Sequence, residues 1–137
     1  MAGIVLAFDF GLKRIGVAVG NGLTGTASAL QPLVARDGTP DWERVARLIA
    51  EWRPERLLVG LPLNMDGTPS DMSAAAERFA RRLHGRFKLP CETMDERLST
   101  REARELLAAG EGRASRDSVA ACVILESWFA QAPAGGG

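Results

Sequence analysis

The sequence has little of what disulfide-rich, zinc-binding or membrane-spanning proteins require. Its 137 residues include two cysteines, Cys91 and Cys122, and one histidine, His84. Two cysteines so far apart form neither a disulfide framework nor a zinc site, so we expect reduced thiols in the cytoplasm. The longest apolar runs reach about half of the roughly 20 residues that a membrane span needs. The N-terminus shows no secretory leader, so we expect a cytoplasmic protein with no membrane contact.

Net charge is also absent, because 17 basic residues balance 17 acidic ones. Proteins that bind nucleic acids usually carry a positive field, which this chain lacks. The basic residues are nevertheless fifteen arginines and two lysines, and arginine presents a planar fork suited to phosphate. A GC-rich genome would produce the same bias. Composition therefore leaves the function open.

What the sequence does contain is the pattern of one α/β domain, placed at residues 1–132, with a disordered tail at 133–137. Short apolar runs predict five strands, at residues 4–10, 15–20, 26–34, 56–62 and 90–95. Three antiparallel strands followed by βαβα crossovers give one five-stranded mixed sheet with helices on both faces.

Four helices are expected around this sheet. Thr39 caps the first, with Pro40 at its first position, and its inward residues are Trp42, Val45, Ala46, Ile49 and Trp52. The second spans 71–84 and buries Met72, Ala75, Ala76, Phe79 and Leu83. A capping box at residues 99–102 opens the third. The last runs from 115 or 116 to 129, with Cys122 in the core.

Asp9 is the most informative single residue. It stands in an otherwise apolar strand, where burying a lone carboxylate is costly without a partner. Gly11, two residues later, would let a ligand approach the backbone. The alternative is a turn-forming acid paired with Lys13 or Arg14. We treat Asp9 as a candidate catalytic residue.

Further acids stand where helices begin. Asp95 and Glu96 close the last strand, and neighbouring strand residues point to opposite faces, so one of them can enter a site. Asp117 opens the final helix, whose apolar residues predict deep packing. The attraction of a helix N-terminus for negative charge also explains either position.

Sheet topology brings these acids together. In open α/β sheets ligands collect outside the carboxyl ends of the strands. Carboxylates that converge there repel each other unless a divalent cation is present, and oxygen ligands suit Mg²⁺ or Mn²⁺. Two such ions about 4 Å apart would clamp the attacking and leaving oxygens of a phosphodiester. The pattern therefore favours a metal-dependent nuclease.

Polar residues near this edge could hold a nucleic-acid backbone. The candidate substrate-binding residues are Lys13, Arg14, Asn64, Thr68, Arg97 and Arg101. Asp66 could add a ligand, but Asp-Gly is also a common turn, which we favour. His84 is expected at the surface rather than in a catalytic role.

Four segments resemble one family. The words DFGLKRIGVA (9–18), GLPLNMDGT (60–68), DERLST (95–100) and DSVAACVILE (117–126) follow the order of the YqgF family, also called RuvX. TGTA (24–27) and DGTPDW (37–42) fit between them, so the match spans nearly the whole chain. One departure is the short segment 109–116, where the family often has an extra basic stretch.

The resemblance implies a ribonuclease H-like fold, related to Holliday-junction resolvases, and a nuclease that processes the 5′ end of pre-16S ribosomal RNA. It implies Asp9, Glu96 and Asp117 as catalytic metal ligands, with Asp95 as a rival to Glu96. The family description alone favours RNA over branched DNA. The open alternatives are a Holliday-junction resolvase and a non-catalytic RNA-binding module acting on a ribosomal particle. Sequence does not separate a monomer from a homodimer.

Overall fold

A mixed sheet organises the chain, and the computed structural model describes residues 3–64, 66–95 and 116–131. Within these residues the sheet has six strands, β1 (Ile4–Asp9), β2 (Arg14–Asn21), β3 (Thr26–Arg36), β4 (Thr39–Pro40), β5 (Arg56–Leu61) and β6 (Cys91–Asp95). Their order across the sheet is β4-β3-β2-β1-β5-β6. The first four pair antiparallel, whereas β5 joins β1, and β6 joins β5, in parallel.

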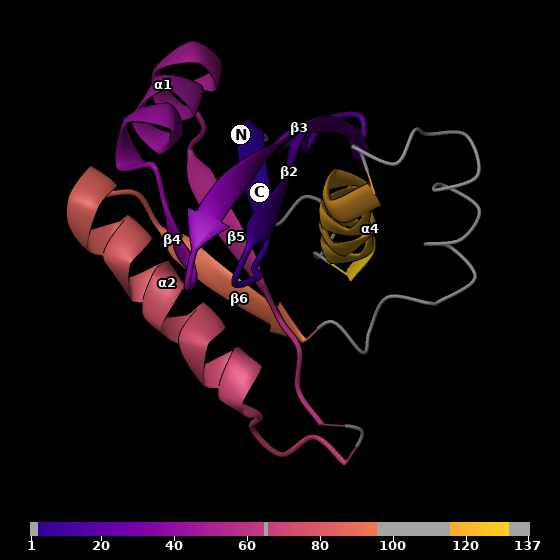
Figure 1. The fold of residues 1–137 in the computed structure, drawn as a ribbon. Helices are drawn as coiled ribbons and strands as arrows, with labels where there is room; N and C mark the ends of the chain where they lie inside the picture. The colour runs from indigo at the N-terminus through magenta and orange to yellow at the C-terminus, as the bar shows by residue number, and fades with distance from the viewer. Residues whose placement is uncertain (1–2, 65, 96–115, 132–137) are drawn as a thin grey trace.

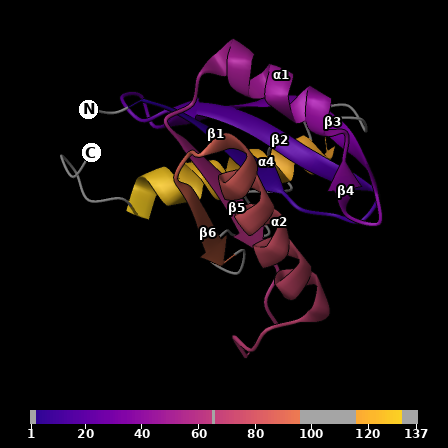
Figure 2. The same ribbon diagram turned by 90° about the vertical axis from the view of Figure 1, so that its left-hand side faces the viewer.

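Helices cover both faces of this sheet, as predicted. Figure 1 shows α1 (Trp42–Trp52) and α2 (Asp71–Phe87) on one side, and α4 (Arg116–Gln131) on the other. The perpendicular view in Figure 2 shows the same three layers. No helix in the described part of the chain has the length and apolar character to cross a membrane. The third expected helix, at residues 99 onward, and the tail at 133–137 lie outside the described residues.

The sixth strand corrects the predicted start of the first helix. Thr39 and Pro40 do not begin α1 but pair with the end of β3 as β4. Asp37 and Gly38 have φ values of 51° and 82°, the left-handed pair that a tight Asp-Gly hairpin needs. The helix is instead capped by Asp41, whose carboxylate accepts the N–H of Glu43 at 3.0 Å. The Asp-Gly signal therefore belongs to a hairpin that the sequence reading overlooked.

β3 is longer than predicted and irregular in the middle. Its register with β2 shifts between Ile15 and Val17, so that Gln31 and Pro32 together face one residue of β2. Proline has no N–H for the ladder and is confined to strand edges and bulges. Pro32 thus explains the position of the bulge.

Each face of the sheet has its own core. The α1/α2 face buries large side chains, among them Leu6, Phe8, Ile15, Leu57, Val59, Phe79 and Leu83. The α4 face buries smaller ones, including Val5, Ala7, Ala18, Ala121 and Cys122. Most predicted inward residues are confirmed, but Ala46 of α1 is exposed and Leu48 packs inward in its place. Trp52 packs on the first core, and Trp128 and Phe129 pack on the second.

Candidate active site at the carboxyl edge of the sheet

Three parallel strands end at the same edge of the sheet. Asp9 is the last residue of β1, Leu61 of β5 and Asp95 of β6. Phe8 pairs with Val59, and Leu61 pairs with Asp95. The ends of β1 and β6 therefore lie at nearly the same height, one strand apart, where ligands collect in such sheets.

Strand alternation separates the two described acids at this edge. Val5 and Ala7 belong to the core under α4, so Asp9, two residues on, lies on the α4 face, where it is partly buried. Met94 also packs under α4, which directs Asp95 to the opposite face. Asp9 and Asp95 thus do not share a face. Glu96, Arg97 and Arg101 lie outside the described residues.

A residue that the sequence reading missed holds the start of α4 beside Asp9. Ser118 is fully buried, and its hydroxyl accepts the backbone N–H of Val17 at 3.1 Å. Val17 follows Gly16, the β2 partner of Asp9. The bond therefore fixes the first turn of α4, whose backbone includes Asp117, next to the end of β1. The available signal was a small hydroxyl residue at an inward position of an apolar helix.

The hairpin after Asp9 positions two of the candidate cations. A Cβ at Gly11 would collide with the carbonyl oxygen of Arg14, so this glycine is required by the turn itself rather than by a ligand. The carbonyl of Lys13 accepts the N–H of Ala35 at 2.8 Å, which ties the hairpin to β3. Lys13 and Arg14 are exposed at this edge.

The loop after β5 is closed by its own side chains. Asp66 accepts hydrogen bonds from both the N–H and the hydroxyl of Thr68, at 3.0 and 2.7 Å. The amide of Asn64 donates to the Thr68 hydroxyl at 3.0 Å and to the Pro69 carbonyl at 3.2 Å. The favoured turn role of Asp66 is therefore confirmed. Asn64 and Thr68 are exposed beside the carboxyl edge, held in one conformation by these bonds.

The donor atoms near this edge suit a hard cation. Asp9 offers carboxylate oxygens, the ligands that Mg²⁺ and Mn²⁺ prefer. The softer donors lie elsewhere, since Cys122 is in the core and exposed His84 bonds the Leu89 carbonyl through Nδ1 at 2.8 Å. Among the described residues no three His, Cys, Asp or Glu side chains gather closely enough to hold a metal ion.

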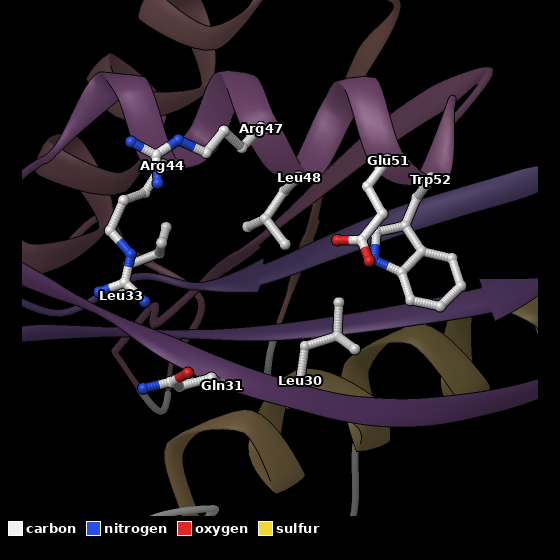
Figure 3. A pocket seen from close by; sticks show the side chains of 8 residues that line it. All are labelled: Leu30, Gln31, Leu33, Arg44, Arg47, Leu48, Glu51 and Trp52. Carbon is white, nitrogen blue, oxygen red and sulfur yellow. The ribbon is translucent and has the colours of Figure 1, made fainter.

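A separate groove of about 310 Å³ lies between α1 and β3 (Figure 3). Leu30, Leu33, Leu48 and Trp52 form its apolar part, and Gln31, Arg44, Arg47 and Glu51 its polar part. Leu33 belongs to the core under α1 and α2, so the groove opens on the face opposite Asp9. It is not part of the carboxyl-edge site.

Comparison with known proteins identifies the family. A family model described as "RuvX: Holliday junction resolvase" matches residues 3–131. A relative from Azotobacter vinelandii, named "Putative pre-16S rRNA nuclease", is 56% identical over 137 residues, covering 96% of each chain. A relative of the same name from Escherichia coli is 54% identical over 136 residues, covering 96% of this chain and 99% of that one.

Solved structures with low sequence identity share the fold. The Thermus thermophilus RuvC structure superposes with a TM-score of 0.55 at 16% identity, covering 92% of this chain and 93% of that one. The fowlpox virus Holliday junction resolvase gives a TM-score of 0.52 at 16% identity, covering 93% and 97%. These likenesses confirm the ribonuclease H-like fold that the sequence predicts. With a family model that spans nearly its whole length, the chain belongs to the RuvX family, described as Holliday junction resolvases.

Proposed function

We propose that this chain is a metal-dependent nuclease that cleaves ribosomal RNA precursors. One observation carries the proposal. Asp9 lies on the α4 face at the carboxyl end of the central strand, and the Ser118–Val17 hydrogen bond holds the first turn of α4 beside it. The carboxylate of Asp9 offers the oxygen ligands that Mg²⁺ and Mn²⁺ prefer. This edge is also where open α/β sheets bind ligands.

The ligand set that we propose is Asp9, Glu96 and Asp117. Asp117 supports it by its place in the anchored first turn of α4. Asp95 points to the other face, so strand alternation favours its neighbour Glu96 over Asp95 as the third acid. A divalent cation held by such carboxylates would lower the pKa of bound water and neutralise charge that develops on the phosphate.

The chain's own residues would orient the substrate around this centre. Exposed Lys13 and Arg14 flank Asp9 on the hairpin and can neutralise phosphates on either side of the scissile bond. Asn64 and Thr68 stand in a self-closed loop, so they can meet a sugar or phosphate without first becoming ordered. Arg97 and Arg101 complete the proposed substrate contacts.

Two substrates follow from the relatives. The names of the relatives from A. vinelandii and E. coli support a pre-16S ribosomal RNA, which we favour because these relatives are more than half identical. The family description supports a four-way DNA junction as the second candidate. A cytoplasmic location and contact with a ribosomal particle belong to the first assignment. A catalyst that cuts a single phosphodiester can act as a monomer, whereas symmetric junction cleavage would favour a homodimer.

The test is metal-dependent cleavage of both substrates by the wild type and by Asp9→Asn. A 5′-leader pre-16S RNA and a synthetic four-way DNA junction are incubated with Mg²⁺, Mn²⁺ or EDTA. Asp9→Asn removes one ligand charge at nearly constant shape. We expect it to lower the rate of cleavage about a hundredfold or more. Its thermal unfolding should match that of the wild type within a few degrees.

The control is Glu51→Gln, an exposed acid of α1 away from the carboxyl edge and from α2, which should leave cleavage unchanged. If only the four-way junction is cut, the substrate is branched DNA and not ribosomal RNA. A wild type that binds RNA but cuts neither substrate with any metal would contradict the nuclease and favour a ribosome-assembly module.

A further inference from the structure

The outer side of α2 carries four exposed arginines, which we call the arginine ridge: Arg78, Arg81, Arg82 and Arg86. The helix faces the sheet with Ala76, Phe79 and Leu83, so Arg78 and Arg81 lie on its opposite side. None of the four has an acidic partner within the described part of the chain, where Arg56–Glu92 is the one salt bridge. In a chain of zero net charge, the ridge gathers four positive charges on one helix, whose outer surface carries Glu77 as its acid beside them.

Two members of the ridge are held in place by an aromatic side chain. The guanidinium carbons of Arg82 and Arg86 lie 5.2 and 4.3 Å from the centre of the Trp42 ring. Trp42 is in turn packed against Phe79, with ring centres 5.9 Å apart. A stacked guanidinium keeps its N–H donors at the rim of its plane, where they can bond an anion. Because these side chains are already ordered, binding would cost them little further entropy.

A glycine lies within the arginine ridge, and neither packing nor backbone conformation requires a glycine there. Gly85 lies in α2 between Arg82 and Arg86, and a Cβ placed on it would meet no atom within 4 Å. Its backbone is helical and needs no left-handed conformation. Glycine disfavours a helix, so packing and conformation both leave its presence unexplained. The missing side chain leaves a smooth surface between two arginines, against which an extended ligand can lie.

We propose that the arginine ridge binds the phosphate backbone of the RNA, at a site separate from the carboxyl edge. Arg78, Arg82 and Arg86 are spaced four residues apart, about 6 Å along the helix axis, which makes a row of charge suited to a polyanion. Figure 1 shows that α2 begins at the loop beside the carboxyl edge and runs away from it. A long substrate can therefore extend from the cleavage site along α2. This inference rests on the proposed function for the identity of the ligand.

Binding measured without cleavage tests the ridge directly. The affinity of the full chain for the 5′-leader RNA is measured in EDTA between 50 and 200 mM KCl. Arg78→Gln/Arg81→Gln removes two ridge charges that make no contact with Trp42. The matched control Arg47→Gln/Arg53→Gln removes two exposed charges, one in α1 and one at its C-cap, and gives the same net charge. Circular dichroism checks that each variant is folded.

We expect the ridge pair to weaken binding about tenfold or more at low salt, because two phosphate contacts are lost. The slope of log affinity against log salt should fall by close to 2, and the control should change little. Gly85→Gln, which fills the smooth surface, should also weaken binding, whereas Gly85→Ala should not. Equal losses in the ridge and control pairs, or none in the ridge pair, would overturn the proposal.

The two proposals fail in different ways. If the ridge proposal is wrong, the ridge pair binds RNA like the wild type while metal-dependent cleavage at Asp9 persists. If the nuclease proposal is wrong, neither substrate is cut, yet the ridge pair still loses affinity relative to its control.

Discussion

The two faces of the sheet are built differently. The α1/α2 face is filled by large side chains, with Phe79 of α2 in contact with the rings of Phe8, Phe10 and Trp42. The α4 face is lined by small ones, since Ala7, Ala18 and Ala121 are all fully buried there. Among the residues that the structure describes, two helices with complete caps cover the first face and one helix covers the second.

This difference suggests a division of roles, in which one face stabilises the fold and the other positions the residues of the candidate site. Small residues let α4 approach the strands closely, and a Cβ at Gly20 would already lie 2.7 Å from Leu125 and 2.8 Å from Phe129. That approach lets the buried Ser118 reach the backbone of β2 and brings the first turn of α4 to Asp9. We infer that the α1/α2 face supplies most of the packing energy, and that the α4 face sets the geometry of the carboxyl edge.

The largest expected effect on stability comes from the α1/α2 face. Phe79→Ala removes the ring at the centre of its aromatic cluster and should cost about 3–5 kcal/mol of unfolding free energy. Urea unfolding measures this loss. Cleavage per folded molecule should remain near the wild-type value when it is measured at saturating substrate and at a temperature where the variant is still folded. A variant that lost activity in proportion to stability or beyond would contradict the division between the faces.

On the α4 face we expect the reverse: a substitution that costs less unfolding free energy should reduce cleavage more. Ser118→Ala leaves the buried N–H of Val17 without its partner and should cost about 1–3 kcal/mol. Because the start of α4 is then released, metal-dependent cleavage should fall about tenfold or more. The matched control is Ser73→Ala, which removes a buried serine from the capping box of α2. That variant should lose a similar stability and keep its cleavage rate.

The smallest expected effect concerns the reactivity of the thiols. Each face of the sheet holds one cysteine, Cys91 on the α1/α2 face and Cys122 on the α4 face. Burial, and secondarily the charge of Glu92, raise the pKa of Cys91 from 9.0 to about 11. At pH 8 its thiolate fraction should therefore be about 100-fold lower than that of an ordinary thiol. In a Cys122→Ala variant, the rate of alkylation should keep rising tenfold per pH unit up to pH 10. A plateau near pH 9 would show that Cys91 is more accessible than the structure indicates.

Local patterns in the sequence predict most of the fold. The apolar runs that become β1, β2 and β5 and the helical period of α2 are strong signals, and the structure confirms them with shifts of a few residues at the ends. The errors fall where two signals compete. Thr39-Pro40 fits a helix start, but the Asp37-Gly38 turn before it favours a hairpin, and strand pairing with β3 decides the outcome.

The candidate site is harder to predict from the sequence. Its geometry depends on which face of a strand each side chain takes, and on contacts between residues far apart in the chain. Asp9 stands out since an acid in an apolar strand is rare, whereas Ser118 is unremarkable until the fold brings its hydroxyl to the backbone N–H of Val17. The choice between Asp95 and its neighbour also requires knowing which side of β6 Met94 packs on. Spacing along the chain alone carries none of this information.

The hydrogen bond between Ser118 and Val17 also bears on the order of assembly during synthesis. Its two residues are 101 positions apart, whereas the hairpin of β1 and β2 closes within a few residues. Contacts of long sequence separation form late, because the chain between them must first be ordered. The strands under α4 therefore leave the ribosome long before the helix that covers them, and their apolar side stays open to association until residues 116–131 arrive.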